Sequence, residues 1–144
     1  MQLQNILFSQ GFGTRRVCAG LVQQGFVQVY PSAEATEPEL VTDSAVELEP
    51  EGLRFQVDGV DWPYAEKAYV MLHKPAGTEC SQKPSTYPSI YTLLPSPLRL
   101  RPSKSAVQGI QAVGRLDQDT TGLLLLSDDG QFSHRMRPRP CRNW

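Results

Sequence analysis

A polar loop set between two glycines, followed by four leucines, constrains this chain more than any other segment. Residues 114–122 read Gly-Arg-Leu-Asp-Gln-Asp-Thr-Thr-Gly, and residues 123–126 are all leucine. A short, continuous apolar run after a turn predicts a buried strand. Because a strand in the core holds the loop before it in place, we expect Asp117 to be a positioned carboxylate. Such a group acts as a nucleophile or as a general base.

Two other interpretations of Asp117 stay open from the residues alone. Aspartate in a loop commonly caps a turn by accepting backbone N–H bonds. Asp119, two residues further on, would complete a pair of carboxylates suited to acid–base hydrolysis. No second acidic cluster elsewhere in the sequence supports that hydrolytic chemistry.

A second motif lies upstream of this loop. A mostly apolar strand predicted over residues 68–73 runs into Lys74-Pro75-Ala76-Gly77. Proline fixes the backbone there, and glycine permits an unusual dihedral angle. We therefore expect Lys74 to be held at the end of a strand by this turn, and taken alone the segment is a common strand–turn pattern with a structural role.

The first thirty residues predict a small helical module followed by a strand. Leu3, Ile6 and Leu7 give a short apolar face, and Thr14 is placed to cap a second helix over about residues 15–24. Arg15 and Arg16 fall in the first turn of that helix, where the helix dipole disfavours cations. A bound anion such as RNA phosphate would explain them, and two solvated arginines are the alternative.

Charge is segregated along the chain, although the formal net charge is only −1. Residues 31–60 hold eight acids against Arg54 alone, whereas residues 98–144 hold eight Arg or Lys against four Asp. A uniformly basic nucleic-acid binder is excluded, but basic ends that meet phosphate are not. Residues 31–52, rich in proline and acids, are expected to form a loop or linker.

Several classes of protein are disfavoured. Three cysteines without a paired short spacing and only two histidines argue against a disulfide framework and against a metal site. No stretch approaches the roughly 20 apolar residues of a membrane helix, and the N-terminus does not resemble a secretory signal. We expect a cytoplasmic, monomeric protein with no metal.

Two resemblances to known families follow from these residues. Residues 2–29, with Thr14-Arg15-Arg16 between two helices and then Phe26-Val27-Gln28-Val29, resemble the αL RNA-binding domain of ribosomal small-subunit protein four. The string from Gly114 to Gly130 resembles the catalytic motif of the bacterial rRNA pseudouridine synthases, and most of all the small-subunit synthase A type. The Lys74 turn, Cys80-Ser81 and residues 130–135 match the same family.

The resemblance implies an α+β fold in two parts. An αL-type RNA-binding module with an acidic linker would occupy residues 1–60, and the first half of a mainly antiparallel-sheet synthase domain would occupy residues 61–144. It implies an isomerase that detaches uracil from its ribose, rotates it and rejoins it through ring carbon 5. Asp117 would be the catalytic residue, either attacking the anomeric carbon or supporting elimination at the sugar.

The same resemblance implies a partner and a set of contacts. The partner would be ribosomal RNA of the small subunit or its assembly precursor, and no cofactor is needed because the reaction has no redox or hydrolytic step. RNA contacts are expected from four basic side chains: Arg15, Arg16, Lys74 and Arg115.

Two departures from the family pattern lead to further expectations. The family continues past the length seen here, and residues 137–143 do not follow its pattern, so we expect a truncated chain with an unpaired sheet edge that is poorly active or inactive alone. Two alternatives remain: a non-catalytic RNA-binding or ribosome-assembly module, and the same isomerisation on large-subunit rRNA.

Overall fold

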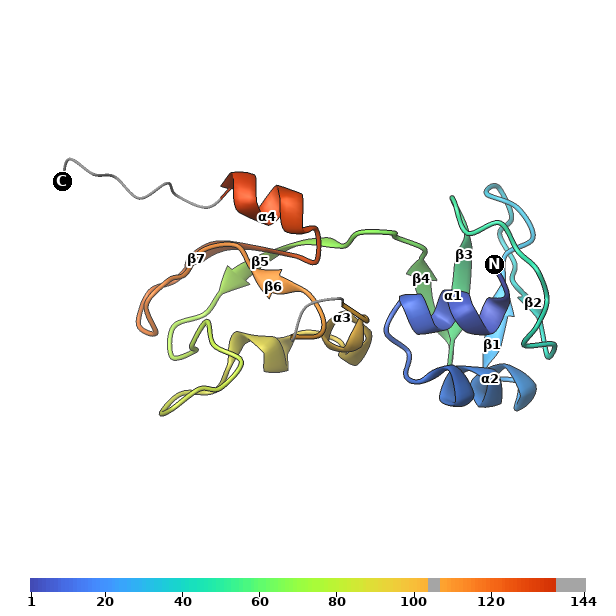
Figure 1. Cartoon of the computed structure of the whole chain (residues 1–144), viewed down its shortest axis with the longest axis horizontal. Coiled ribbons are helices and arrows are strands. Elements are labelled where there is room, and N and C mark those ends of the chain that lie inside the picture. The colour runs from blue at the N-terminus through green and yellow to red at the C-terminus, as the bar shows by residue number, and fades with distance from the viewer. Residues whose placement is uncertain (104–106, 137–144) are drawn as a thin grey trace.

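The computed structural model describes residues 1–103 and 107–136, which form two modules, each with its own sheet and core (Figure 1). We define the N-terminal module as residues 1–63 and the C-terminal module as the described residues of 68–136. Both sheets are antiparallel throughout, and helices accompany each. The α+β class expected from the sequence is confirmed.

The N-terminal module contains two helices and a four-stranded sheet. Its elements are α1 (Leu3–Ser9), α2 (Arg15–Gln23), β1 (Val27–Val29), β2 (Glu39–Leu40), β3 (Arg54–Val57) and β4 (Val60–Pro63), and the strand order is β2-β1-β3-β4. The Thr14 side chain accepts a hydrogen bond from Val17 N at 3.2 Å, so the predicted helix cap is confirmed. The cap bond sets the start of the second helix, so Arg15 and Arg16 are its first two residues.

The turn between β3 and β4 is a two-residue hairpin at Asp58 and Gly59. Both residues have positive φ angles, 51° and 80°. Primed turns require positive φ at both central positions and match the twist of the strands that they join. Eight residues of the module form its buried core: Leu3, Leu7, Cys18, Val22, Val27, Val29, Phe55 and Val57.

The acidic segment over residues 31–52 is a loop, as expected, but it is not a detached linker. It contributes strand β2, and its Val41, Val46 and Leu48 pack against the N-terminal core. Leu3 N donates to Val46 O at 2.9 Å, which ties the segment to the start of α1. The apolar side chains spaced among the acids explain why the segment folds back onto the module instead of extending into solvent.

The C-terminal module is built around a three-stranded sheet. Its elements are β5 (Tyr69–Lys74), the 3₁₀ helix η1 (Ile90–Leu93), α3 (Ser96–Leu100), β6 (Gln111–Ala112), β7 (Gly122–Ser127) and α4 (Gly130–Met136), and the strand order is β5-β7-β6. Seven residues form its buried core: Ala68, Ile90, Tyr91, Leu94, Ile110, Leu124 and Leu126.

The leucine-rich strand β7 is buried on one face only, which corrects the expectation of a fully buried strand. Leu124 and Leu126 are 3% and 1% exposed, whereas Leu123 is 65% exposed. Met71, which lies across the ladder on the neighbouring strand, is 75% exposed. Side chains alternate between the two faces of a strand, and in the described residues only one face of this sheet is covered by a core.

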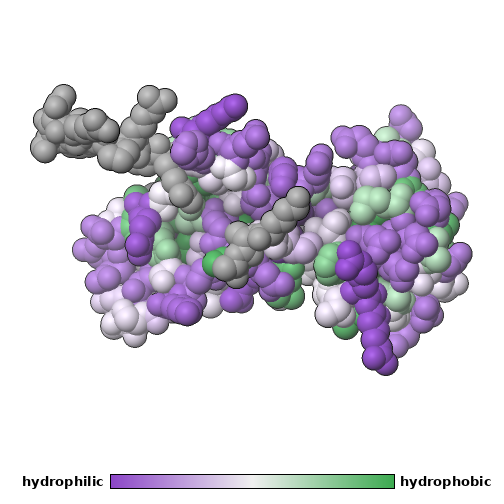
Figure 2. All heavy atoms as spheres, viewed as in Figure 1, coloured by the Kyte–Doolittle hydropathy of each residue, from purple (hydrophilic) through white to green (hydrophobic). Residues whose placement is uncertain are grey.

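The surface is mostly hydrophilic on the face seen in Figure 2, where apolar residues form small, separate groups over both modules. In the described part of the chain, no helix is long and apolar enough to cross a membrane. The last part of the basic C-terminal segment, residues 137–144, lies outside the described residues.

Candidate active site

Asp117 lies in the loop that joins β6 to β7. The loop begins where Val113 N donates to Leu125 O at 2.7 Å, and it closes on itself where Thr120 N donates to Asp117 O at 3.0 Å. Gly114 has a φ of 95°, a conformation that glycine adopts without a steric penalty. The core strand β7 thus anchors one end of the loop, as the sequence predicts.

Lys74 holds this loop through hydrogen bonds to its backbone carbonyls. Its side chain is fully buried, and Nζ donates to Thr120 O at 2.8 Å, to Pro75 O at 3.1 Å and to Gln118 O at 3.3 Å. The backbone of the same turn adds a bond from Gly77 N to Gln118 O at 2.7 Å. Because three carbonyls satisfy the buried ammonium, Lys74 holds the loop in shape, and its burial does not fit the direct RNA contact expected from the sequence.

A cavity of about 260 Å³ opens beside Asp117. It is lined by Glu79, Cys80, Arg115, Leu116, Asp117 and Gln118. We call it the aspartate cavity. Asp117 and Arg115 are both exposed there, and neither side chain has a hydrogen bond or ion pair to another residue in the described ranges. The Asp117 carboxylate is therefore accessible to a ligand, and it does not act as the turn cap that the sequence left open.

Glu79, the second carboxylate of this cavity, is differently placed. Its Oε2 accepts backbone N–H bonds from Tyr87 at 2.8 Å, Thr86 at 3.0 Å and Ser85 at 3.1 Å. These bonds lower the pKa of the Glu79 carboxyl from its ordinary value, and the bond from Tyr87 N has the largest effect. Glu79 thus organises the loop over residues 79–87, which leaves Asp117 as the carboxylate of the cavity without such partners in the described chain.

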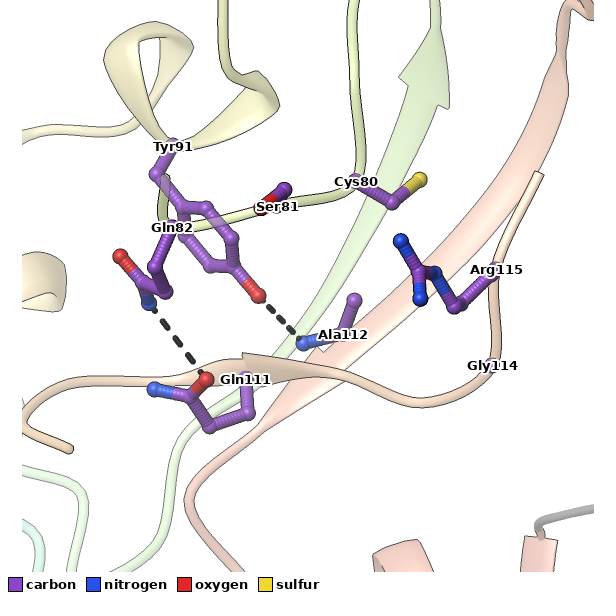
Figure 3. A pocket seen from close by; sticks show the side chains of 8 residues that line it. All are labelled: Cys80, Ser81, Gln82, Tyr91, Gln111, Ala112, Gly114 and Arg115. Atoms are coloured by element: carbon purple, nitrogen blue, oxygen red, sulfur yellow. Dashed lines mark hydrogen bonds between the residues drawn. The ribbon is translucent and has the colours of Figure 1, made fainter. Parts of the chain in front are cut away.

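A second cavity, of about 550 Å³, adjoins the aspartate cavity and shares Cys80 and Arg115 with it. Figure 3 shows residues 80–82 on one side of it, strand β6 on the other and Tyr91 of η1 reaching between them. We call it the amide cavity, after its Gln82 and Gln111. Arg115 stands where the two cavities meet.

Arg15 and Arg16 are not part of either cavity. Both are exposed on α2, and the guanidinium of Arg15 lies 4.1 Å from the centre of the Phe8 ring, within the range of a cation–π contact. Figure 1 shows α2 near one end of the long axis and the orange loop before β7 near the other. Any contact that these arginines make with RNA is therefore remote from Asp117.

The paired-carboxylate interpretation gains no support from the geometry. Asp119 is exposed and does not line the aspartate cavity. Among the residues that the structure describes, no group of three His, Cys, Asp or Glu side chains is arranged to hold a metal ion.

Sequence reasoning missed three side chains that shape the site. Glu79 fixes one wall of the aspartate cavity, while Gln82 and Gln111 come together across the amide cavity at 3.4 Å. No local motif marks them, since Gln82 and Gln111 are 29 positions apart in the chain. Contacts between distant segments bring them together, among them the bond from Ala112 N on β6 to the Tyr91 hydroxyl on η1 at 2.9 Å.

The family model described as RNA pseudouridylate synthase matches residues 68–139. The ribosomal small subunit pseudouridine synthase A of Haemophilus influenzae is 39% identical over 106 residues, which cover 73% of this chain and 42% of that protein. The enzyme of the same name from Escherichia coli is 34% identical over 131 residues, which cover 89% of this chain and 49% of that protein.

A solved structure titled as a pseudouridylate synthase is 30% identical, covers 94% of this chain and 51% of that one, and superposes with a TM-score of 0.38. The chain spans about half the length of the curated relatives that it matches. The matched region contains the whole of the Asp117 loop, the Lys74 turn that supports it and both cavities. By this match, the chain belongs to the RNA pseudouridylate synthase family.

Proposed function

We propose that this chain provides the catalytic aspartate of an enzyme that converts a uridine of small-subunit ribosomal RNA to pseudouridine. One observation carries the assignment: the Asp117 side chain is exposed in a cavity and uncommitted to other described residues, on a loop clamped by the buried Lys74. The names of the curated relatives support the small subunit as the source of the RNA.

The chemistry needs a group of this kind at the sugar. The bond between uracil N1 and the ribose C1′ breaks, the base turns, and a bond from its C5 to C1′ forms; C5 loses a proton and N1 gains one. An ionised carboxylate suits either attack on C1′ or removal of a sugar proton. The atoms of the substrate are conserved and there is no net oxidation or reduction, so the reaction consumes no second substrate.

The position of the target base imposes a further requirement. A base stacked in RNA is out of reach of a side chain in a cavity, so the nucleotide has to be extruded. Arg115 lies next to Asp117 in the aspartate cavity and is uncommitted to other described residues, which suits it to a backbone phosphate beside the extruded nucleotide.

We propose a second RNA contact in the N-terminal module, in keeping with its resemblance to the αL domain. Exposed Arg15 and Arg16 would bind phosphate there, at the far end of the molecule from Asp117. Such a contact adds affinity without adding chemistry. We further propose that the protein acts as a monomer in the cytoplasm.

An activity assay with matched variants tests the aspartate assignment. Because the chain spans half the length of its relatives, we would assay both the 144-residue chain and a fusion that continues with the part of the Haemophilus influenzae relative beyond the matched region. Small-subunit rRNA is incubated with each, and its nucleosides are separated and quantified. We expect pseudouridine from the fusion, and little or none from the chain alone.

In the fusion, Asp117→Asn should abolish product while leaving RNA affinity nearly unchanged, because only the nucleophile or base is lost. Asp119→Asn is the matched control and should retain activity, since Asp119 lies outside the aspartate cavity. Pseudouridine formation by Asp117→Asn would refute the assignment. RNA binding without any base modification would favour the non-catalytic alternative, and product only in large-subunit rRNA would move the substrate to the other subunit.

A further inference from the structure

The amide cavity lies beside the Asp117 loop, and the proposed reaction gives it no role. Its volume of about 550 Å³ lies in the range of pockets that bind small ligands, about 300–1,000 Å³. The two cavities share Cys80 and Arg115 as lining residues, so one ligand could extend from the aspartate cavity past Arg115 into the amide cavity.

The amide cavity is charged at one end and uncharged elsewhere, and this distribution indicates the chemical class of its ligand. Of the eight described residues that line it, Arg115 alone is charged, and it stands at the end next to the aspartate cavity. The other walls offer amides, hydroxyls and a tyrosine ring. A nucleotide has the same division, with an anionic phosphate at one end and an uncharged ring with polar edges at the other.

Hydrogen bonds to the backbone hold two of the polar side chains that line the cavity, Gln111 and Tyr91, in fixed positions. The side-chain amide nitrogen of Gln111 donates to Gln108 O at 3.0 Å and to Gly109 O at 3.4 Å, so its Oε1 is directed toward Gln82. The Tyr91 hydroxyl accepts from Ala112 N at 2.9 Å, which leaves its own proton without an acceptor among the described residues. A ligand entering the cavity therefore meets one oriented acceptor and one available donor.

Gln82, a third polar residue that lines the cavity, retains hydrogen-bonding capacity for a ligand. Its Nε2 makes only a long contact of 3.4 Å to Gln111 Oε1, and its carbonyl oxygen has no partner in the described chain. An amide with a free acceptor and a free donor pairs in bidentate fashion with the edge of a base. Single-stranded RNA is read through such edges when its bases are splayed out.

We propose that the amide cavity binds the base of the nucleotide adjacent to the target uridine, with Gln82 and Gln111 contacting the edge of that base and Arg115 the phosphate that joins the two nucleotides. This inference rests on the proposed function, because it takes Asp117 as the residue that meets the target. It makes Gln82 a specificity-determining residue for the sequence around the modified uridine.

Binding of short RNAs to the 144-residue chain tests the proposal. The probes are fluorescently labelled seven-nucleotide RNAs with a central uridine, in which each adjacent position is varied through all four bases, and affinity is measured by fluorescence anisotropy. We expect discrimination of about five- to hundredfold between bases at one adjacent position, the range for a bidentate amide–base contact.

Gln82→Ala should reduce that discrimination to about twofold or less, because the bidentate contact is gone. Gln82 is exposed, so this variant should fold, and its thermal melting is compared with that of the wild type to verify this. Gln131→Ala, at an exposed position on α4 outside both cavities, is the matched control and should keep the wild-type preference. Arg115→Gln should weaken binding of all the probes equally.

The outcomes separate this proposal from the proposed function. Pseudouridine formation by the fusion, combined with no base preference or with a preference that survives in Gln82→Ala, overturns the base site and leaves the proposed function standing. Failure of the fusion to form pseudouridine, combined with a base preference lost in Gln82→Ala, refutes the isomerase and supports the base site. Absence of binding to every probe also overturns the base site.

Discussion

The Nε atom of Arg101 donates to Asp128 Oδ2 at 2.7 Å, and this ion pair lies in the interior at the junction of the two modules, with side chains only 4% and 14% exposed. The same guanidinium donates to Gln10 Oε1 at 3.2 Å and to Ala65 O at 2.8 Å. Gln10 belongs to the N-terminal module, Ala65 to the segment between modules, and Asp128 to the C-terminal module. One buried side chain therefore connects all three parts of the chain.

Asp128→Asn should lower the free energy of unfolding by about 3–5 kcal/mol, because it leaves the buried Arg101 charge without its anion. Combining Asp128→Asn with Arg101→Met should recover part of that loss, since the unpaired charge is then removed. Urea denaturation of the wild type, the two single variants and the double variant gives the coupling. Additive losses in the double variant would show that the ion pair is energetically unimportant.

Gly11→Ala should separate the modules. A Cβ atom at Gly11 would lie 1.9 Å from Pro97 O, and the φ of 89° already disfavours a side chain. Gly52→Ala is the matched control, because its φ is 76° but no atom lies within 4 Å of the added Cβ. We expect Gly52→Ala to cost only the backbone strain of about 1–2 kcal/mol and Gly11→Ala to cost more.

Thermal unfolding of the two glycine variants measures this difference directly. In addition, small-angle scattering should show a larger radius of gyration for Gly11→Ala, because the clash is with the backbone of the other module and cannot be relieved by a side-chain rotation. Equal destabilisation and equal dimensions for the two variants would contradict the close approach at Gly11.

Lys74→Met should loosen the Asp117 loop. The change removes the donor to Thr120 O and Gln118 O, and each buried carbonyl left without a partner costs about 1–3 kcal/mol. Removing a buried charge offsets part of this loss, so we expect activity of the fusion to fall further than its stability. Amide exchange of Gly77, whose N–H donates to Gln118 O, should become faster.

The matched control for the Lys74 prediction is Lys83→Met, at an exposed position on the loop over residues 79–87. It should leave both activity and the exchange of the Gly77 amide unchanged. Protection of the Gly77 amide that is equal in Lys74→Met and the wild type would show that the lysine does not hold the loop.

Acid should release the loop that Glu79 organises. Its folded-state pKa is lowered, chiefly by the N–H bond from Tyr87 and then that from Thr86, so folding favours the ionised form. The stabilisation is complete above the ordinary pKa of 4.5 and is lost as the pH falls below that value through the lowered folded-state pKa. Amide exchange of Ser85, Thr86 and Tyr87, corrected for intrinsic rates, should report the loss.

Glu79→Gln is the comparison for this acid transition. It keeps the shape of the side chain and removes the charge, so exchange at the same three amides should already be raised at neutral pH and should not change further in acid. A pH dependence in Glu79→Gln equal to that of the wild type would assign the transition to another group.

Local sequence patterns were sufficient for several parts of this fold. The cap at Thr14, the strand that runs into Lys74 and the strand that follows the Asp117 loop were predicted, because each depends on neighbours within a few residues. Whether Asp117 is catalytic stays a prediction, but its position at the end of an anchored loop followed from the glycines and leucines around it.

Contacts between distant residues were not predictable in this way. The family resemblance implied an RNA contact for Lys74, yet the structure buries its side chain, and Nζ donates to carbonyls 44 and 46 positions away. The sequence also suggested a fully buried β7, whereas Leu123 faces outward. Burial depends on which elements cover each face of a sheet, and no local pattern specifies that coverage.

The sequence by itself determined the chemistry available to this protein, namely a carboxylate next to an arginine on a short, rigid loop. Tertiary structure decided which groups surround that carboxylate: Glu79 bonded to backbone N–H groups, Lys74 underneath, and the amide cavity alongside. The physical reason is range. Turn and strand preferences arise from interactions within a few residues, while cavities and buried charges arise where segments far apart in the chain pack together.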